Sequence, residues 1–388
     1  MTDGALSHIR VLDLSRVLAG PLAGQILGDL GAEVIKVERP GRGDDTRAWG
    51  PPWFPDAEAD AENRQAAYYL AANRNKRSVA IDIARPEGQA LVRELAAQSD
   101  VVLENFKAGG LARYGLDYAS LSAVNPRLIH CAITGFGQDG PYAHKPGYDV
   151  LIQAMGGLMH ITGEPDGPPQ KAGVALADVM TGLYAVIGIQ AALAHRERTG
   201  AGQFIDVALM DVQAAALVNQ AMNYLVSGTP PTRMGNAHSN IVPYQPFRAA
   251  DGHFILTVGN DDQFARLCDA LGRADLAADA RFATNAARVE NREVLIPILA
   301  GIFAEGTTAH WLDAIGAAGV PCGPINDLAG VFADPQVRHR KMATAVPDSA
   351  GRAVPTLGSP LKLSRTPGTP YTAPPALGEH TDAVLRDL

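Results

Sequence analysis

Cysteine is scarce in this chain, and the few cysteines are not arranged for covalent or metal chemistry. Only three occur among 388 residues, and no two of them have the CxxC spacing. They are Cys131, Cys268 and Cys322. An odd number of scattered cysteines excludes a disulfide framework and disfavours a zinc site. We therefore expect small buried thiols, no metal site and a reducing compartment.

Long basic runs and long apolar runs are also missing. The net charge is −8 and the two basic clusters, 74–77 and 338–341, are short, which disfavours a nucleic-acid partner. The first residues lack the basic and apolar regions of a signal peptide. The longest weakly polar stretch, 179–194, is too short to span a membrane. These absences predict a cytoplasmic protein without a membrane partner.

The chain does have enough apolar residues, 47%, for a large core and enough length for two domains. Its N-terminal half alternates strand-like and helix-like segments. The strand candidates are 9–14, 33–37, 78–83, 100–104 and 127–133, and the helix candidates are 21–30 and 86–98. Strands separated by helices predict βαβ crossovers and a mostly parallel sheet, so the expected fold class is α/β. The interval 40–75 is predicted to be a surface excursion.

The C-terminal half indicates a second, smaller domain. Composition shifts to Pro, Gly, Thr and Asn over 227–236, which marks a domain boundary. Before it we expect a helix over 177–198, a strand over 204–209 and a long helix to about 226; after it, a strand over 253–258 and a helix over 262–271. The predicted domains are 1–226 and 227–324, and the remaining segment, 325–388, is expected to wrap over another part of the molecule.

The first predicted strand leads into the turn 15–24, at the place where open α/β sheets bind ligands. Its glycines do not have the GxGxxG spacing, so a nicotinamide or flavin cofactor is disfavoured. Two interpretations fit the turn equally well. Its backbone N–H groups bind a phosphate at the start of the next helix, or it is a tight turn without a ligand.

A single carboxylate, Asp178, lies in the apolar run 173–184 with small residues on both sides. Burial there would desolvate the carboxylate and leave it either neutral or reactive. Carboxylates serve as covalent nucleophiles toward acyl groups. The alternative is that Asp178 caps the helix that follows. The local pattern alone favours the cap, whereas the rest of the chain favours the nucleophile.

Several segments, taken in order, carry a resemblance that covers nearly the whole chain. They are 11–21, 31–39, 75–78, 82–88, 100–106, 177–182 and 200–203. In these segments the chain resembles the family III CoA-transferases, also called the CaiB/BaiF family. Within that family, the segments 156–163 and 235–247 are most similar to the succinyl-CoA–glutarate CoA-transferases.

The resemblance implies a fold and a partner. Each chain of the family has a large Rossmann-like domain and a small α/β domain joined by two long linkers. Two such chains pass through one another and form an obligate homodimer. The C-terminal segment, here 325–388, returns to the large domain. Because the CoA thioester is a substrate, no cofactor is implied.

The resemblance also implies a nucleophile and a lid. The family's catalytic aspartate matches Asp178, which would take CoA from succinyl-CoA as an aspartyl thioester and pass it to a dicarboxylate such as glutarate. The glycine-rich lid matches 258–263, where Gly259 is the one glycine. Gly259 is either a hinge and oxyanion donor, or part of an ordinary strand-to-helix turn with Asp261 or Asp262 as the N-cap.

Contacts to CoA carry over from the family position by position. They fall on Leu18, Ala19, Arg39, Ile81, Asp82, Ile83, Ala84, Asn105, Phe106, Lys107, Arg113, Lys145 and Tyr148. Arg113 and Lys145 would pair with phosphate; the alternative is that they are solvated surface cations. Leu18 replaces the glutamine of formyl-CoA transferases, which argues against formyl and oxalyl groups as the natural acyl pair.

The distal carboxylate of a dicarboxylate acceptor requires a cation or another hydrogen-bond donor. The candidates are Arg47, Arg74, Arg77, His238 and Tyr244. For the last two, the alternative is a loop histidine and a packed tyrosine.

Two other functions stay open from the sequence. The α-methylacyl-CoA racemases share the fold but have a histidine at the position of Tyr148, and a neutral phenol is a poor base at neutral pH. A non-catalytic acyl-CoA-binding protein would have Asp178 solvated at the surface, far from any pocket.

Overall fold

The chain folds into two compact units in a computed structural model that describes residues 4–55, 64–368 and 370–388. The larger unit comprises Met1–Leu158, Lys171–Gly228 and Pro335–Leu388, and the smaller comprises Met159–Gln170 and Thr229–Asp334. The sequence predicted one domain boundary between residues 226 and 227 and another between residues 324 and 325. The segment Met159–Gln170, which the sequence pattern assigned to the large domain, belongs to the smaller unit.

A six-stranded sheet forms the centre of the larger unit, and all of its strands are parallel. The strands are β1 (Arg10–Asp13), β2 (Glu33–Glu38), β5 (Lys76–Ala80), β6 (Val101–Glu104), β7 (Ile129–Thr134) and β8 (Phe204–Ala208). Their order is β5-β2-β1-β6-β7-β8, so the direction of winding reverses between β1 and β6. In such doubly wound sheets the ligand crevice lies at the carboxyl ends of the strands on either side of this reversal. The predicted α/β class with a parallel sheet is confirmed.

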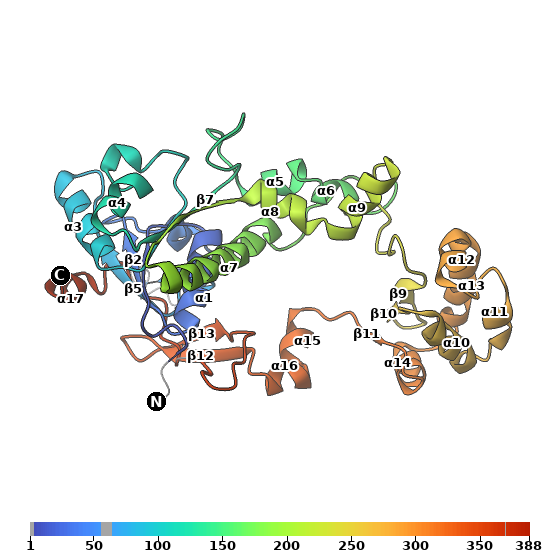
Figure 1. Cartoon of the computed structure of the whole chain (residues 1–388). Coiled ribbons are helices and arrows are strands. Elements are labelled where there is room, and N and C mark those ends of the chain that lie inside the picture. Colours follow the sequence, from blue (N-terminus) through green and yellow to red (C-terminus); the bar gives the residue numbers. More distant parts are fainter. Residues whose placement is uncertain (1–3, 56–63, 369) are drawn as a thin grey trace. The chain divides into compact units, whose positions relative to one another are not determined.

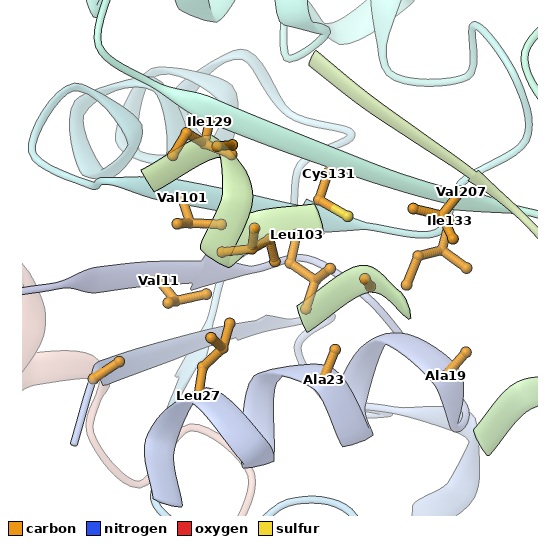
Figure 2. Close-up of a cluster of buried hydrophobic side chains, with 14 of the residues drawn as sticks. Val11, Ala19, Ala23, Leu27, Val101, Leu103, Ile129, Cys131, Ile133 and Val207 are labelled. Carbon is orange, nitrogen blue, oxygen red and sulfur yellow. The ribbon is translucent and has the colours of Figure 1, made fainter. Parts of the chain in front are cut away.

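Helices cover both faces of this sheet (Figure 1). Helices α1 (Ala19–Asp29) and α7 (Leu176–Thr199) pack on one face; α3 (Pro86–Ala97), α4 (Tyr118–Val124) and α17 (Thr381–Arg386) pack on the other. Strand side chains alternate between the two cores, as period-2 geometry requires: Val11 joins the first core and Leu12 the second. Figure 2 shows the first core, where side chains of the strands lie against Ala23 and Leu27 of α1.

Helices α1 and α7 approach each other closely because small residues line their contact. A Cβ added at Gly182 of α7 would lie 2.8 Å from the carbonyl oxygen of Ala19. Only glycine therefore permits this separation. The stretch 179–194 was predicted to be too short to span a membrane, but the helix that contains it, α7, has 24 residues and by length and composition could cross one. Its residues Ala177, Ala185 and Ile189 are buried in the core of the larger unit.

Two expectations about the larger unit are wrong. The single long helix expected after β8 is two helices, α8 (Leu209–Ala216) and α9 (Val218–Ser227), because Val218 has a φ of +42° that interrupts the helical backbone. The interval 40–75 is not a surface excursion where it is described, since Asp44, Thr46 and Tyr69 are buried. It contains η1 (Asp45–Ala48), β3 (Trp53–Phe54), β4 (Gln65–Ala66) and α2 (Ala67–Leu70).

The remaining elements of this unit are short. They are η3 (Ala112–Tyr114), α5 (Asp149–Met155), α16 (Pro335–His339), β12 (Ala343–Pro347) and β13 (Ala353–Leu357). The first residue of α6 (Leu158–Ile161) belongs to the larger unit and the others belong to the smaller. The C-terminal segment reaches the edge strand β5, where the N–H of His380 donates to the carbonyl oxygen of Ser78 (2.9 Å). Val384 of α17 then completes the second core.

The smaller unit has its own core and a three-stranded antiparallel sheet. Its strands are β9 (Tyr244–Arg248), β10 (His253–Thr257) and β11 (Cys322–Pro324), and its helices are α10 (Asp261–Ala270), α11 (Ala274–Ala278), α12 (Asn285–Glu290), α13 (Arg292–Ala304), α14 (Thr308–Ala317) and α15 (Leu328–Ala333). Phe247, Phe254 and Phe303 pack edge-to-face or tilted in this core. The predicted strand 253–258 and helix 262–271 match β10 and α10 to within a residue.

Candidate active site

A cavity of ≈ 700 Å³ lies beyond the carboxyl ends of β1, β6 and β7, and Asp178 is part of its wall. This is the crevice that the strand order predicts. The predicted CoA residues Leu18, Ala19, Asn105, Phe106, Lys107, Arg113, Lys145 and Tyr148 line the same cavity. Asp178 is half-buried in this cavity. A non-catalytic binding protein was expected to have Asp178 solvated at the surface, far from any pocket.

A second cavity of ≈ 450 Å³ adjoins the first. The predicted residues Arg39, Ile81, Asp82, Ile83, Ala84, Phe106 and Arg113 line it. Arg16, Phe106 and Arg113 belong to the walls of both cavities. Every residue that the family resemblance placed against CoA thus lines one of two neighbouring cavities, although these residues come from five separate stretches of the chain.

The cations around the larger cavity are available for an anionic ligand. Among the described residues, Lys107, Arg113 and Lys145 form no ion pair with an acidic side chain. The Lys145 ammonium lies 3.9 Å from the centroid of the Tyr142 ring, and Arg113 lies over Tyr114. Unpaired cations in a crevice of this kind suit phosphate groups.

Asp178 stands in the first turn of α7, but it does not cap the helix. The N-cap position is Ala175, which makes no side-chain capping bond. The acceptor comes from another helix: Oδ1 of Asp149, in α5, accepts the N–H groups of Ala177 (2.9 Å) and Asp178 (3.3 Å). Because Asp149 satisfies these helix-end donors, the carboxylate of Asp178 is free to face the cavity. The capping interpretation of Asp178 is therefore wrong.

The environment of Asp178 makes its carboxylate basic. Burial, and then the negative charge of Asp149, raise the pKa of Asp178 from 3.8 to about 7. Asp149 is itself only 8% exposed, and its other oxygen accepts from Gln153 Nε2 at 2.7 Å. A carboxylate with this pKa is a better nucleophile than an ordinary one and is still ionised in a large fraction of molecules at neutral pH.

Tyr68 and Trp49 are neighbours of this site that the sequence did not reveal. Burial, and then the charges of Asp178 and Asp149, raise the pKa of Tyr68, which places its hydroxyl in the field of both carboxylates. The Trp49 ring packs edge-on against Tyr68 with 5.1 Å between centroids. Both residues come from the interval 40–75, which has no regular pattern from which a site could be predicted.

Comparison with known proteins identifies the family. The model of CoA-transferase family III matches residues 6–381. The chain belongs to CoA-transferase family III. It is 55% identical to the succinate–glutarate CoA-transferase of Agrobacterium fabrum (99% of this chain, 95% of that one) and 45% identical to the succinyl-CoA:glutarate CoA-transferase of Mus musculus (99% and 86%). The crystal structure of a CaiB/BaiF family protein from Brucella suis is similar at 52% identity, with a TM-score of 0.86 over 99% of both chains.

As a member of this family the protein is a CoA-transferase. The likeness extends to a less similar sequence: the crystal structure of Rv3272 from Mycobacterium tuberculosis matches at 31% identity with a TM-score of 0.86, over 98% of this chain and 99% of that one. The absence of a metal site remains a prediction. Among the described residues, however, no three His, Cys, Asp or Glu side chains are grouped to hold a metal ion. The three cysteines are free, and two of them are buried.

In this CoA-transferase, Asn105 shapes the site rather than reaching outward. Its side-chain Oδ1 accepts the N–H of Arg16 (2.9 Å), and its Nδ2 donates to the Arg16 carbonyl oxygen (2.6 Å). Both polar groups of the amide are thereby engaged by one peptide segment. The loop after β6 thus holds the turn after β1, and the two sides of the crevice are tied together.

The arginines predicted to bind the acceptor's distal carboxylate have structural partners instead. Arg47 makes two bonds to Glu38 (2.8 and 2.7 Å), Arg74 is 4% exposed and pairs with Asp29, and Arg77 pairs with Glu33 (2.7 Å). None of the three lines the cavity that holds Asp178. These candidate assignments are corrected: each guanidinium neutralises an acid within the larger unit.

The remaining predicted residues, Gly259, His238 and Tyr244, lie in the smaller unit. The N–H of Gly259 donates to Oε1 of Gln263 (2.6 Å), so an oxyanion role would require this bond to open. The N-cap of α10 is Asn260, not the aspartates that follow it. The ring of His238 packs on Tyr244 with 5.2 Å between centroids, and its Nδ1 accepts the N–H of Asn240.

Proposed function

We propose that this CoA-transferase moves CoA from succinyl-CoA to glutarate through covalent intermediates on Asp178. The observation that carries the proposal is the half-buried Asp178 carboxylate, with its raised pKa, in a cavity lined by unpaired cations. The named activities of the relatives at 55% and 45% identity support this pair of acids. Leu18, which offers no hydrogen bond to a small acyl group, is consistent with a larger acyl chain.

The cycle consists of four acyl exchanges. Asp178 attacks the thioester carbonyl of succinyl-CoA; the C–S bond breaks, and a mixed anhydride and CoA thiolate form. The thiolate attacks the Asp178 carbonyl and releases succinate, leaving an aspartyl-CoA thioester. Glutarate attacks the carbonyl of that thioester; the C–S bond breaks, and a glutaryl–Asp178 anhydride and the CoA thiolate form. The thiolate then attacks the glutaryl carbonyl of the anhydride and yields glutaryl-CoA and free Asp178. No net proton, electron or cofactor is consumed, and only a carboxylate nucleophile regenerates an anhydride with an incoming acid.

The two adjoining cavities divide the CoA molecule between them in this proposal. The thiol arm occupies the cavity of Asp178, and the nucleotide occupies the cavity bounded by Arg39 and Ile81. Arg113, which lines both cavities, and Lys107 and Lys145, which line the cavity of Asp178, pair with phosphate oxygens.

Apolar surface on the larger unit supports a homodimer. Leu183 and Ile187 of α7 are 46% and 61% exposed, and Leu225 and Val226 of α9 are 70% and 81% exposed. Apolar side chains exposed in this number mark an interface, and the family implies a second copy of the chain as its occupant. Light scattering should give twice the chain mass of 40.8 kDa. A monomer at micromolar concentration would contradict the proposal.

An acceptor screen tests the substrates. The protein is mixed with succinyl-CoA and, separately, glutarate, itaconate, malate, mesaconate or acetate, and new acyl-CoA species are identified by mass. We expect glutaryl-CoA to form fastest and acetyl-CoA not at all. Glutaryl-CoA formation no faster than acetyl-CoA formation would overturn the choice of acceptor. Solvent deuterium at the α-carbon of recovered acyl-CoA, without transfer, would instead establish the racemase reaction.

A further inference from the structure

A strained residue, Val17, lies in the turn between β1 and α1, at the wall of the Asp178 cavity. Its φ is +75°, in the left-handed region that β-branched side chains avoid. Such a conformation persists only where the surrounding structure holds it. The turn therefore needs an external support, and its position in the site makes that support relevant to the reaction.

Buried or half-buried side chains from three other segments hold the backbone of this turn. Lys36 Nζ, from β2, donates to the Ser15 carbonyl oxygen at 2.8 Å. Asn105, after β6, holds both backbone groups of Arg16. Oδ1 of Asp44, after β2, accepts the N–H of Val17 at 3.2 Å. The hydrogen bond to Asp44 thus acts on the strained residue itself.

Asp44 is in turn fixed in place. It is 1% exposed, and its Oδ1 also accepts from the N–H (3.0 Å) and the hydroxyl (2.8 Å) of Thr46. Its Oδ2 lies 2.9 Å from Lys36 Nζ, and both of these side chains are fully buried. Burial opposes ionisation, but Lys36 and the Thr46 N–H together hold the pKa of Asp44 below its ordinary value. Asp44 is consequently an ionised, rigid acceptor aimed at Val17.

The turn that contains Val17 leads directly to the contact between α1 and α7. Leu18 and Ala19 follow directly, and Ala19 begins α1. The Ala19 carbonyl oxygen lies close to Gly182: a Cβ added at Gly182 would be 2.8 Å from that oxygen. Gly182 is one helical turn beyond Asp178 on the same face of α7. A shift of the turn would therefore move the wall of the cavity relative to the carboxylate that reacts.

We propose that Asp44 is a positioning residue of the transfer reaction: it holds Val17 in its left-handed conformation and so sets the distance between the bound thioester and Asp178. The inference rests on the CoA-transfer activity but not on the identity of the acceptor. If the acceptor screen selects another acid, the kinetics below are measured with that acid, so the two proposals fail separately.

The test is a double-mutant cycle between Asp44 and Val17. Asp44→Ala should lower kcat by about ten- to a hundredfold, since misplacement of a reacting group by about 1 Å has effects of that size. Val17→Gly should raise kcat about tenfold in the Asp44→Ala background, relative to the effect of Val17→Gly on the wild-type enzyme. The reason is that glycine adopts positive φ without a holding contact. Asp44→Asn, which keeps an acceptor oxygen for the Val17 N–H, should lose less than Asp44→Ala.

Val218 provides a matched control, since it is also a valine with positive φ (+42°) and does not line the cavity. Val218→Gly should not rescue Asp44→Ala. Equal rescue by the control, or no coupling between Asp44 and Val17 in folded variants, would overturn the proposal. If the Asp44→Ala variant does not fold, Thr46→Val replaces Asp44→Ala in the cycle, because Thr46→Val removes a hydroxyl donor that orients Asp44. Val17→Gly should then rescue Thr46→Val in the same way. Absence of that rescue would count against the proposal.

Discussion

Asp178→Asn should abolish CoA transfer, with kcat falling by at least about 10³-fold, the scale on which loss of a covalent nucleophile acts. The amide has nearly the same shape as the carboxylate but cannot form an anhydride or a thioester with CoA. Because Asp149 and not Asp178 caps α7, the substitution removes no structural hydrogen bond of the helix end. CoA binding and the dimer should therefore persist.

The measurement has two parts. Intact mass after incubation with succinyl-CoA should show the wild-type chain with one CoA attached less one water, and the Asp178→Asn chain unchanged. Asp211→Asn is the matched control, because Asp211 is an exposed acid in the first turn of α8 and does not line the cavity. Normal turnover by Asp178→Asn, or a CoA adduct on it, would refute the nucleophile.

The same substitution should stabilise the fold at alkaline pH. The folded pKa of Asp178, about 7, is above its unfolded value of 3.8, so the stability that its protonated form contributes is present below pH 3.8 and lost as the pH rises through 7. The difference of about three pKa units corresponds to at most about 4 kcal/mol, at about 1.4 kcal/mol per unit. Asp178→Asn should therefore unfold at a higher temperature than wild type at pH 8, and the difference should shrink toward pH 4.

The second large effect is expected at Asp149, and its signature is the pH profile. For wild type, kcat/KM should rise with pH through about 7 as Asp178 ionises, because only the carboxylate attacks. Asp149→Asn removes the neighbouring charge, so the midpoint should move to lower pH. It should not reach the ordinary value of an aspartate, since burial is the larger cause of the shift.

Asp149→Ala separates the charge of Asp149 from its capping role. It shifts the profile in the same direction but also leaves the N–H groups of Ala177 and Asp178 without their acceptor. Loss of such a cap destabilises by about 0.5–2 kcal/mol and loosens the turn that carries the nucleophile, so kcat should fall about tenfold or more below that of Asp149→Asn. A pH midpoint equal to wild type in both variants would show that Asp149 does not act on Asp178.

The corrections share one physical origin. Arg47 and Arg74 look like free cations in the sequence, yet each is neutralised by an acid, Glu38 and Asp29, brought to it by folding. Asp44 and Tyr68 lie in an interval without periodicity, so no local pattern distinguished them from surface residues. The break at Val218 was missed for a related reason: a β-branched residue at positive φ contradicts its own local preference.

By itself, the sequence determined the elements of the sheet, the crossovers between them and the segments that meet at its carboxyl edge. Apolar runs of strand length and helical periodicity are local properties, and parallel pairing brings the ends of such strands to one side. Asp178 and the residues of the two cavities could be named on that basis together with the family resemblance. Only the tertiary structure decided which acid caps α7, which one raises the pKa of Asp178 and which one holds Val17. Those roles depend on charged groups and hydrogen-bond donors from distant segments that meet within about 3 Å in a poorly solvated interior. Electrostatic interactions are strong there, so they outweigh the conformational preference of each local segment.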